Sequence, residues 1–433
     1  MDNDDQTAWG HGRKWLTGMA LALGFIAFLY VEEDVRGRLT WSQTQDECAR
    51  QGMDLRWLAL VPPPIPEAEN IFAAPKMEEW FEGRGRNELT RRIEPSLGSN
   101  LVSETYLPTT NRTDAEQYLI ATRPFEPELR IMRQGLQRPR ARLRGDYGRA
   151  VDLPVVNFVA IRAVSRLLVA RVHCHLLMGE EAGALDDLAL LRDLRRLLGA
   201  PPQTLLSAMI DTAISRLYVE AVADGLAAHR WSEPALAGLE RDLRGIYLPS
   251  HLRQGAVNAA RFSVNVLETG AHQGGLVLEG NRLPDRWRWG PHGWFLQNLS
   301  WIAQCDRAAL RMFDETNRAI HLENAPPAPT PGRPFQILAA IAVPNFLVSA
   351  RTTARVQTDI FQKEITCALE RYRLAKRCYP PDLGALVPSY LERIPNDVLG
   401  GKPPRYILGT NDDFELSSAG DGLTNRWAWP PAP

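Results

Sequence analysis

The chain begins with an uncharged apolar run at positions 15–31, bounded by charges of opposite sign. Arg13 and Lys14 precede the run, and Glu32, Glu33 and Asp34 follow it. As a helix the run covers roughly 25 Å, close to the ~30 Å hydrocarbon core of a bilayer. No small-residue cleavage site follows it, which favours a retained anchor over a cleaved signal peptide. We therefore expect a transmembrane helix at 15–31 that contacts the lipid bilayer, after a tail at 1–14.

The basic residues before this run predict its orientation. Lysine and arginine are enriched on the cytoplasmic side of membrane helices, so we expect the N-terminus in the cytoplasm and the bulk of the chain outside it. Arg36 and Arg38, beyond the run, weigh against this orientation. The 45 arginines against 5 lysines are typical of a GC-rich bacterial genome. The predicted location is thus the inner (cytoplasmic) membrane of a bacterium.

Positions 32–150 predict an irregular, partly helical region next to the membrane. A short helix is expected over 40–51. The prolines of 61–66 predict an extended strap over the chain's own domain, with docking on a partner as the alternative. The residues at 113–116 match a capping box, which marks a helix start. Arginines between 123 and 149 alternate with acidic residues, which favours an ion-paired surface over one that binds lipid or nucleic acid.

From 151 to 324 the apolar spacing becomes helical. Two stripes recur every three or four residues, at Ile161, Val164, Leu168, Val172 and Leu176 and at Leu185, Leu188, Leu191 and Leu194. Gly179 is expected to end the first helix and Gly199 the second, which gives an antiparallel hairpin. Further helices are expected over 204–226, 232–246 with Ser232 as N-cap, and 299–323.

The turn of this hairpin, at 176–188, resembles one tetratricopeptide repeat (TPR). Gly179 stands at the turn, and Ala184 and Leu188 stand at the packing positions. The helices that follow do not keep the 34-residue period of that family. The resemblance therefore implies a TPR-like helical domain without a regular array.

Four tryptophans gather at 284–301, in a predicted loop that leads into a helix: Trp287, Trp289, Trp294 and Trp301. Aromatic faces stack on sugar rings or nucleobases and anchor protein partners. We treat the four as candidate interaction residues. A loop held to the helical core by its own aromatic rings is the favoured interpretation.

A proline-rich linker at 325–334 is the best predicted domain boundary. After it, 335–376 predicts a long helix in which Pro344 introduces a kink or marks the start. Its strongly apolar first part is interpreted as buried or at an interface rather than as a second membrane crossing. The alternating segments 405–408 and 413–421 predict the two strands of a hairpin.

The module at 335–433 resembles the C-terminal half of type II secretion pseudopilins. The shared features are the long helix, Tyr379-Pro-Pro-Asp-Leu-Gly-Ala-Leu-Val-Pro, Ile394-Pro-Asn-Asp, and a hairpin ending at Ser418-Ala-Gly-Asp-Gly. The resemblance implies a small α+β module. Pseudopilins start at this helix after a Gly-Phe processing site and carry a glutamate at the fifth mature position. Here the helix is internal, follows Pro334-Phe335 and has Ala339 at that position, so the same processing is not expected.

Some pseudopilins bind calcium after the hairpin, which makes Asp412, Asp413 and Asp421 candidate metal ligands. Three scattered carboxylates do not fill the six to eight oxygen positions around Ca²⁺, so ordinary turn residues are the favoured interpretation. No cofactor is expected. The whole chain also resembles a family of uncharacterised membrane-anchored proteins of verrucomicrobial bacteria, which implies the anchor and no particular chemistry.

The sequence indicates no reaction, because the common hydrolase, zinc-protease and nucleotide-binding motifs are absent. His173 and His175 lie two apart on a helix and cannot share a metal ion, so His175 is interpreted as a satisfied core histidine. Asp186–Asp187 and Glu78–Glu79 are interpreted as solvated helix faces. The five cysteines, which have no metal-like spacing, are Cys48, Cys174, Cys305, Cys367 and Cys378.

These patterns predict a mainly α, single-pass membrane protein with a TPR-like domain and a small C-terminal α+β module. The favoured function is an extracytoplasmic scaffold or interaction protein with a protein partner in the envelope. The alternative is an envelope enzyme or glycan-binding protein that uses 284–301. Nucleic-acid binding is not expected, because the formal net charge is only −1.

Overall fold

The computed structural model describes residues 3–97, 111–272, 277–278, 281–282, 291–328, 330, 333, 336–410, 413–420 and 423–429. Helix makes up 68% of the chain and strand 5%, which confirms the mainly α fold class. Two compact units form. The first unit comprises Met1–Ala59, Ala260–Ala308 and Pro326–Asn345, and the second comprises Leu60–Ala259, Ala309–Ala325 and Phe346–Pro433.

These bounds differ from the domains expected from the sequence. The predicted boundary after 325–334 separates two modules, whereas in the structure the helix that follows it belongs to the same unit as 60–259. The physical reason is that this helix, α13 (Phe346–Lys376), packs along α8 (Leu205–Ala227) and α9 (Glu233–Arg244). A proline-rich segment therefore connects the units without separating a C-terminal domain.

The first unit is built around α1, a single helix from Asn3 to Arg50. The separate helix expected over 40–51 is wrong, because no proline interrupts the segment and Arg36 bonds back to Glu32 and Glu33 one turn earlier. The other elements are the C-terminal half of α10 (Leu248–His272), β1 (Val277–Leu278), β2 (Asn281–Arg282), α11 (His292–Leu310) and α12 (Ile337–Ala342).

Two glycines allow α1 and α11 to cross in backbone contact. A Cβ on Gly37 would lie 2.4 Å from Cα of Gly293, and one on Gly293 would lie 1.8 Å from the carbonyl oxygen of Glu33. The N–H of Gly293 donates to the Asp34 carboxylate at 2.7 Å. Beyond this crossing, a core of Val264, Leu267, Leu299, Ile302, Leu338 and Ala339 holds the unit together.

The apolar run at 335–347 does not form one continuous helix. Its six-residue helix α12 ends at Ala342, and α13 begins at Phe346, so Pro344 lies in the break, as expected for a helix start. A helix of six residues is too short to cross a bilayer.

The second unit begins with short helices and irregular chain: η1 (Trp57–Leu60, shared with the first unit), η2 (Glu67–Glu69), η3 (Ile71–Ala73), α2 (Met77–Phe81), α3 (Glu88–Ile93), η4 (Glu94–Leu97), α4 (Arg112–Thr122), η5 (Arg123–Phe125), α5 (Glu126–Gly135) and η6 (Ala150–Asp152). The predicted capping box at 113–116 is wrong. The N-cap of α4 is Asn111, whose side chain accepts from the N–H of Thr113.

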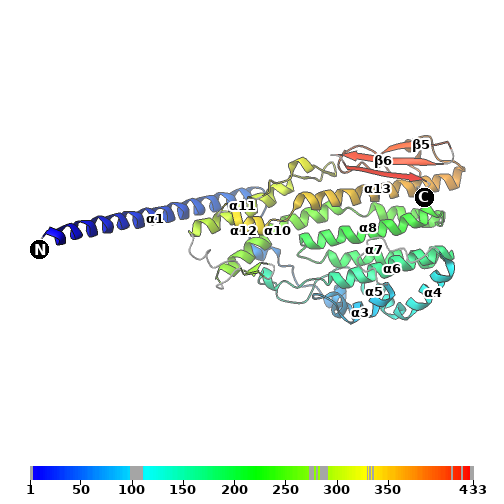
Figure 1. Ribbon diagram of the computed structural model, residues 1–433. Coiled ribbons are helices and arrows are strands. Elements are labelled where there is room, and N and C mark those ends of the chain that lie inside the picture. The colour runs from blue at the N-terminus through cyan, green and yellow to red at the C-terminus, as the bar shows by residue number, and fades with distance from the viewer. Residues whose placement is uncertain are drawn as a thin grey trace. The chain divides into compact units, whose positions relative to one another are not determined.

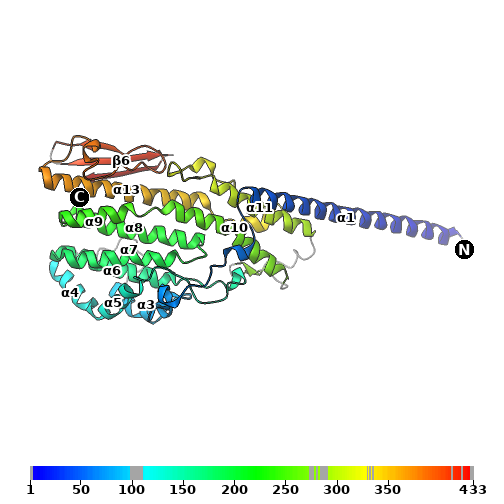
Figure 2. The ribbon, with the colours of Figure 1, turned by 180° about the vertical axis from the view of Figure 1, so that it is seen from behind.

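The centre of the second unit is a stack of long helices, in which α6 (Phe158–Met178), α7 (Glu181–Leu198), α8 and α13 lie side by side (Figures 1 and 2). The predicted hairpin is confirmed: Gly179 ends α6 with a left-handed φ of 81°. Thr204 forms a capping box with Ser207 at the start of α8. Ser232 is at the N-cap of α9, although its side chain makes no capping bond.

The helix predicted over 299–323 is wrong at its C-terminal end. After α11 ends at Leu310, a short hairpin forms from β3 (Phe313–Asp314) and β4 (Ala319–Ile320), followed by η8 (Leu322–Asn324). Asn317 donates to the Asp314 carboxylate within this turn. An asparagine and an aspartate that bond locally in this way favour a turn over a helix interior.

The C-terminal sheet lies against α13 (Figure 1). It has the order β5-β6-β7, all antiparallel, from β5 (Arg405–Leu408), β6 (Phe414–Gly420) and β7 (Leu423–Trp429), and η10 (Leu383–Leu386) precedes it. The predicted hairpin is confirmed by the pairing of Leu408 with Phe414. The third strand, β7, adds to the two that the sequence pattern predicts. Because helices cover one side of α13 and the sheet covers another, residues at consecutive positions from Ile360 to Glu370 are all buried.

Candidate functional site

The structure places two of the four candidate tryptophans, and both lie on α11. Trp301 is only partly exposed and packs against the core of the first unit. Trp294 is also half-buried, in the first turn of the helix. Trp287 and Trp289 lie outside the described residues. Trp301 therefore holds α11 to the core of the first unit, whereas the loop that the favoured interpretation concerns lies outside the described residues.

Of the three candidate metal ligands, the structure describes Asp413. It lies in the turn between β5 and β6, where its carbonyl oxygen accepts from the N–H of Gly409 at 2.9 Å. A Cβ on Gly409 would lie 1.8 Å from the Asp413 carboxylate, so a side chain there would force this carboxylate to move. Asp412 and Asp421 lie outside the described residues. Within the described part of the chain, no group of three or more His, Cys, Asp or Glu side chains is placed to hold a metal ion.

A cleft of about 740 Å³ in the second unit gathers the charged side chains that sequence reasoning did not connect. It is lined by the C-terminal ends of α7 and α9, the start of α10, one residue each of α8 and of the β3–β4 turn, and parts of the connecting segments. Five arginines contribute to it: Arg192, Arg195, Arg196, Arg241 and Arg253. Four carboxylates also line it: Asp193, Asp211, Asp242 and Glu315. We call it the arginine-rich cleft.

A buried aspartate and a histidine are among the residues that line this cleft. Asp211, which is 4% exposed, accepts from Arg195 through both oxygens at 2.6 and 3.1 Å. Nδ1 of His251 lies 3.0 Å from the second of these oxygens. Burial alone would raise the pKa of Asp211, but Arg195 and His251 outweigh it, and the pKa lies below its usual range. An ionised carboxylate only accepts hydrogen bonds, so Nδ1 of His251 carries a proton.

The other ring nitrogen of His251 has no partner. Nε2 is buried and makes no hydrogen bond in the structure. With Nδ1 held by a carboxylate, Nε2 of the neutral ring accepts a hydrogen bond, and in the imidazolium it becomes a second donor. This geometry suits either general-base chemistry or recognition of a ligand hydroxyl.

A second Arg–Asp–His cluster lies inside the helix stack and corrects one prediction. Asp187, expected on a solvated helix face, is 1% exposed. Arg171 donates to one of its oxygens and Arg133 to the other, each at 2.8 Å. His175 bonds Glu180 through Nδ1 at 2.8 Å and places Nε2 3.7 Å from Asp187. His175 is therefore a satisfied histidine, as predicted, in a closed cluster.

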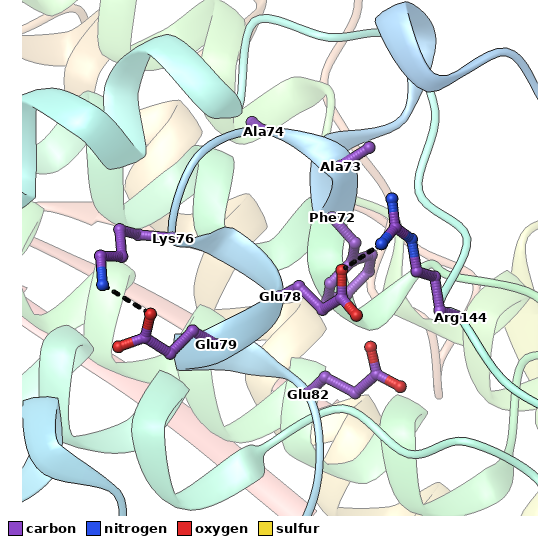
Figure 3. A pocket seen from close by; sticks show the side chains of 8 residues that line it. All are labelled: Phe72, Ala73, Ala74, Lys76, Glu78, Glu79, Glu82 and Arg144. Atoms are coloured by element: carbon purple, nitrogen blue, oxygen red, sulfur yellow. Dashed lines mark hydrogen bonds and ion pairs between the residues drawn. The ribbon is translucent and has the colours of Figure 1, made fainter.

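A smaller cleft of about 570 Å³ lies beside α2, which forms part of its lining (Figure 3). Lys76 pairs with Glu79 at 2.6 Å, and Arg144 pairs with Glu78 at 3.3 Å. Glu82 lies beside them, and one of its oxygens is buried without a partner. Burial and the neighbouring Glu78 raise the pKa of Glu82. Apart from Glu82, the charges here are paired on the surface, which fits the predicted solvated face of Glu78 and Glu79.

The sequence carries a signal for the closed cluster and none for the open cleft. Asp187 lies three residues after Ala184 and four before Leu191, on the apolar stripe of α7, and this phase indicates burial. Asp211 likewise lies on the buried face of α8. Its partners Arg195 and His251 are 16 and 40 residues away on other helices, and no local pattern connects them.

Comparisons with known proteins identify no relative: no family model, no curated protein and no solved structure matches this chain. Inferences about function therefore rest on the geometry of the chain itself.

Proposed function

We propose that this chain is a single-pass protein of a bacterial inner membrane whose bulk lies outside the cytoplasm and acts as a scaffold or interaction protein. The observation that carries the proposal is the contrast along α1. The segment from Trp15 is long and apolar enough to cross a membrane, and none of its most apolar window is buried. Further along the same helix, Thr44 and Cys48 are buried in the first unit. One continuous helix would thus join a bilayer to a folded unit.

The shape of the second unit supports the scaffold role. The stack from α6 to α13 offers a long helical surface of the kind that TPR-like proteins use for binding. The combination of a long helix with a small antiparallel sheet is compatible with the pseudopilin-like module. Strand β5 forms an edge of that sheet and exposes Ile407 and Leu408 by 39% and 42%. An envelope protein that adds a strand or a helix to these surfaces is the proposed partner.

Membrane anchorage is tested by placing charges in α1. Leu21 and Phe25 are 71% and 61% exposed, so Leu21→Arg with Phe25→Arg leaves the folded units intact. Each arginine at the centre of a bilayer costs about 3 kcal/mol. The double variant should leave the membrane fraction on alkaline washing. Leu39→Arg, at a residue of similar exposure beyond the proposed span, should stay bound. If the wild type, the double variant and Leu39→Arg are all retained equally in the membrane fraction, the proposed anchor is contradicted.

Orientation is tested with a native cysteine. Of the five cysteines, only Cys378 is exposed, and the other four are buried. A membrane-impermeant maleimide should label Cys378 in intact spheroplasts, and Cys378→Ser should abolish the labelling. Labelling only after lysis would place the second unit in the cytoplasm and overturn the proposal.

The partner is tested by crosslinking mass spectrometry in native membranes. Lysines are scarce, with only 5 in the chain, so a carboxylate-reactive crosslinker is needed. Reproducible crosslinks from 346–433 to pilin-like or secretion proteins support the scaffold. Crosslinks confined to the chain itself remove this support.

An envelope enzyme remains a second candidate, favoured by the unpartnered Nε2 of His251 beside Asp211. This alternative would be supported by a hydrolase activity of the wild-type protein that the His251→Asn variant lacks. The glycan-binding alternative at 284–301 has less support, because the described Trp294 and Trp301 are half-buried on α11.

A further inference from the structure

The charges of the arginine-rich cleft do not balance. Three of its arginines take all four carboxylates. Arg192 bonds Asp193 and Asp242 at 2.9 and 2.7 Å, Arg195 bonds Asp211, and Arg253 pairs with Glu315 at 3.4 Å. The remaining two, Arg196 and Arg241, have no carboxylate partner among the residues that the structure describes. The cleft is therefore lined by five guanidinium groups and four carboxylates, and Arg196 and Arg241 lie outside its ion pairs.

These two arginines differ in how they are held. Arg196 donates to the carbonyl oxygens of Leu136 and Arg138, which fix its guanidinium without neutralising it. Arg241 is exposed in the last turn of α9 and makes no ion pair in the described part of the chain. One cation is thus positioned in advance and the other is free to close on a ligand. Planar guanidinium groups bind phosphate oxygens in pairs, which makes phosphate the anion that fits best.

The neutral groups of the cleft favour the same ligand. Nε2 of His251 lacks a partner and accepts from a hydroxyl, such as that of a protonated phosphate, or donates to a phosphate oxygen when the ring is charged. The side chains of Arg196, Arg241 and His251 therefore line one cavity.

We propose that the arginine-rich cleft binds a ligand that carries a phosphate group, held by Arg196, Arg241 and Nε2 of His251. The proposal does not rest on the scaffold function. The phosphate belongs either to a small soluble molecule or to a lipid headgroup, and both present non-bridging phosphate oxygens.

The test is isothermal titration calorimetry of the full-length protein in a non-ionic detergent at constant ionic strength. Inorganic phosphate should bind saturably, whereas sodium chloride at matched ionic strength should not. Arg241→Gln should weaken phosphate binding about tenfold or more, the loss expected for one charge-assisted contact. Arg230→Gln is the matched control, because Arg230 is also exposed and precedes the opposite end of the same helix. It should bind within about twofold of the wild type.

A second variant separates binding from folding. His251→Asn retains a donor near the position of Nδ1, and so the bond to Asp211, but removes Nε2. Its midpoint temperature of unfolding should equal that of the wild type, whereas its affinity for phosphate should be lower. Absence of saturable phosphate binding, or equal affinities of Arg241→Gln and Arg230→Gln, overturns the proposal.

A parallel titration with dioctanoyl phosphatidylglycerol, below its micelle-forming concentration, distinguishes the two sources. Tighter binding than inorganic phosphate, lost in Arg241→Gln, assigns the site to a lipid headgroup. Equal or weaker binding than inorganic phosphate assigns it to a soluble phosphate compound.

Discussion

Two clusters in the second unit use the same three residue types, an arginine, an aspartate and a histidine, in different surroundings. Around Asp187 both carboxylate oxygens accept hydrogen bonds, from Arg171 and Arg133, and His175 has carboxylates near both ring nitrogens, while Nε of Arg133 is buried without a partner. Around Asp211 the histidine keeps one nitrogen without a partner, and the cluster borders a cleft of about 740 Å³. Residue type alone therefore does not distinguish a structural cluster from a binding site.

The two clusters differ in the exposure of their arginine side chains and in the elements that surround them. The side chain of Arg171 is 6% exposed and that of Arg195 is 16% exposed. In the closed cluster the partners come from α5, α6 and α7, which pack against one another. In the open one, Arg195 comes from the last turn of α7 and His251 from the start of α10, and the cluster borders the arginine-rich cleft.

The largest predicted effect is on stability in the closed cluster. Asp187→Ala leaves the buried Arg171 and Arg133 without their shared acceptor, which we expect to lower the free energy of unfolding by about 3–5 kcal/mol. Urea unfolding of the full chain measures this change. The neighbouring Asp186→Ala, at an exposed position, should change it by less than about 0.5 kcal/mol. Similar effects of the two variants would refute a closed, structural cluster.

A smaller loss is expected in the open cluster. Asp211→Asn keeps an acceptor oxygen for Arg195, and water from the cleft hydrates the guanidinium. The free energy of unfolding should therefore fall by about 1–3 kcal/mol in the same urea experiment. A loss larger than that of Asp187→Ala would contradict the distinction between the two clusters.

The tightness of the closed cluster is tested at Gly183 on α7. A Cβ there would lie 2.7 Å from the ring of His175, which Glu180 holds in place. Gly183→Ala should thus destabilise the protein by about 1–2 kcal/mol, measured by thermal unfolding. A Cβ on Gly238 of α9 would have nothing within 4 Å, and Gly238→Ala should stabilise by about 0.5–1 kcal/mol through helix propensity. Stabilisation by both would show that His175 has room to move.

The smallest predicted effect is on how folding stability changes at acidic pH. The pKa of Asp211 is lower in the folded protein than in the unfolded chain, because Arg195 and His251 stabilise the carboxylate against the opposing effect of burial. The stability that this group contributes is present above its unfolded pKa of about 3.9 and is lost as pH falls through the folded value. Between about pH 5 and pH 3, Asp211→Asn should therefore lose less stability than the wild type. A steeper acid loss in the variant would contradict the assigned charge.

Much of the helical fold can be predicted from local sequence. Gly179 and Thr204 lie where a helix must end or begin, and each acts through its own backbone or its neighbours within three residues. The single long α1 is harder to predict, because the acidic residues at 32–34 resemble a helix end, whereas Arg36 pairs with two of them along the helix. Strand β7 is also hard to predict, because Thr424, Asn425 and Arg426 interrupt any alternation in Leu423–Trp429 and the hairpin before it already completes the expected pattern.

The candidate site is less predictable because its residues are distant in sequence. Asp211, Arg195 and His251 come from three helices, and only their packing brings the side chains together. The tryptophans show the opposite case. Trp301 attracts attention by residue type, yet its position on α11 places it against the core.

The most direct test of the difference between the two clusters follows the histidine ring nitrogens themselves. Full-length protein with ¹⁵N-labelled histidine is titrated with inorganic phosphate, and the imidazole resonances are assigned with His251→Asn and His175→Asn. We predict that Nε2 of His251 shifts on saturation while both nitrogens of His175 stay unchanged. An unchanged His251, or equal shifts at the two residues, would contradict the division into one open and one closed cluster.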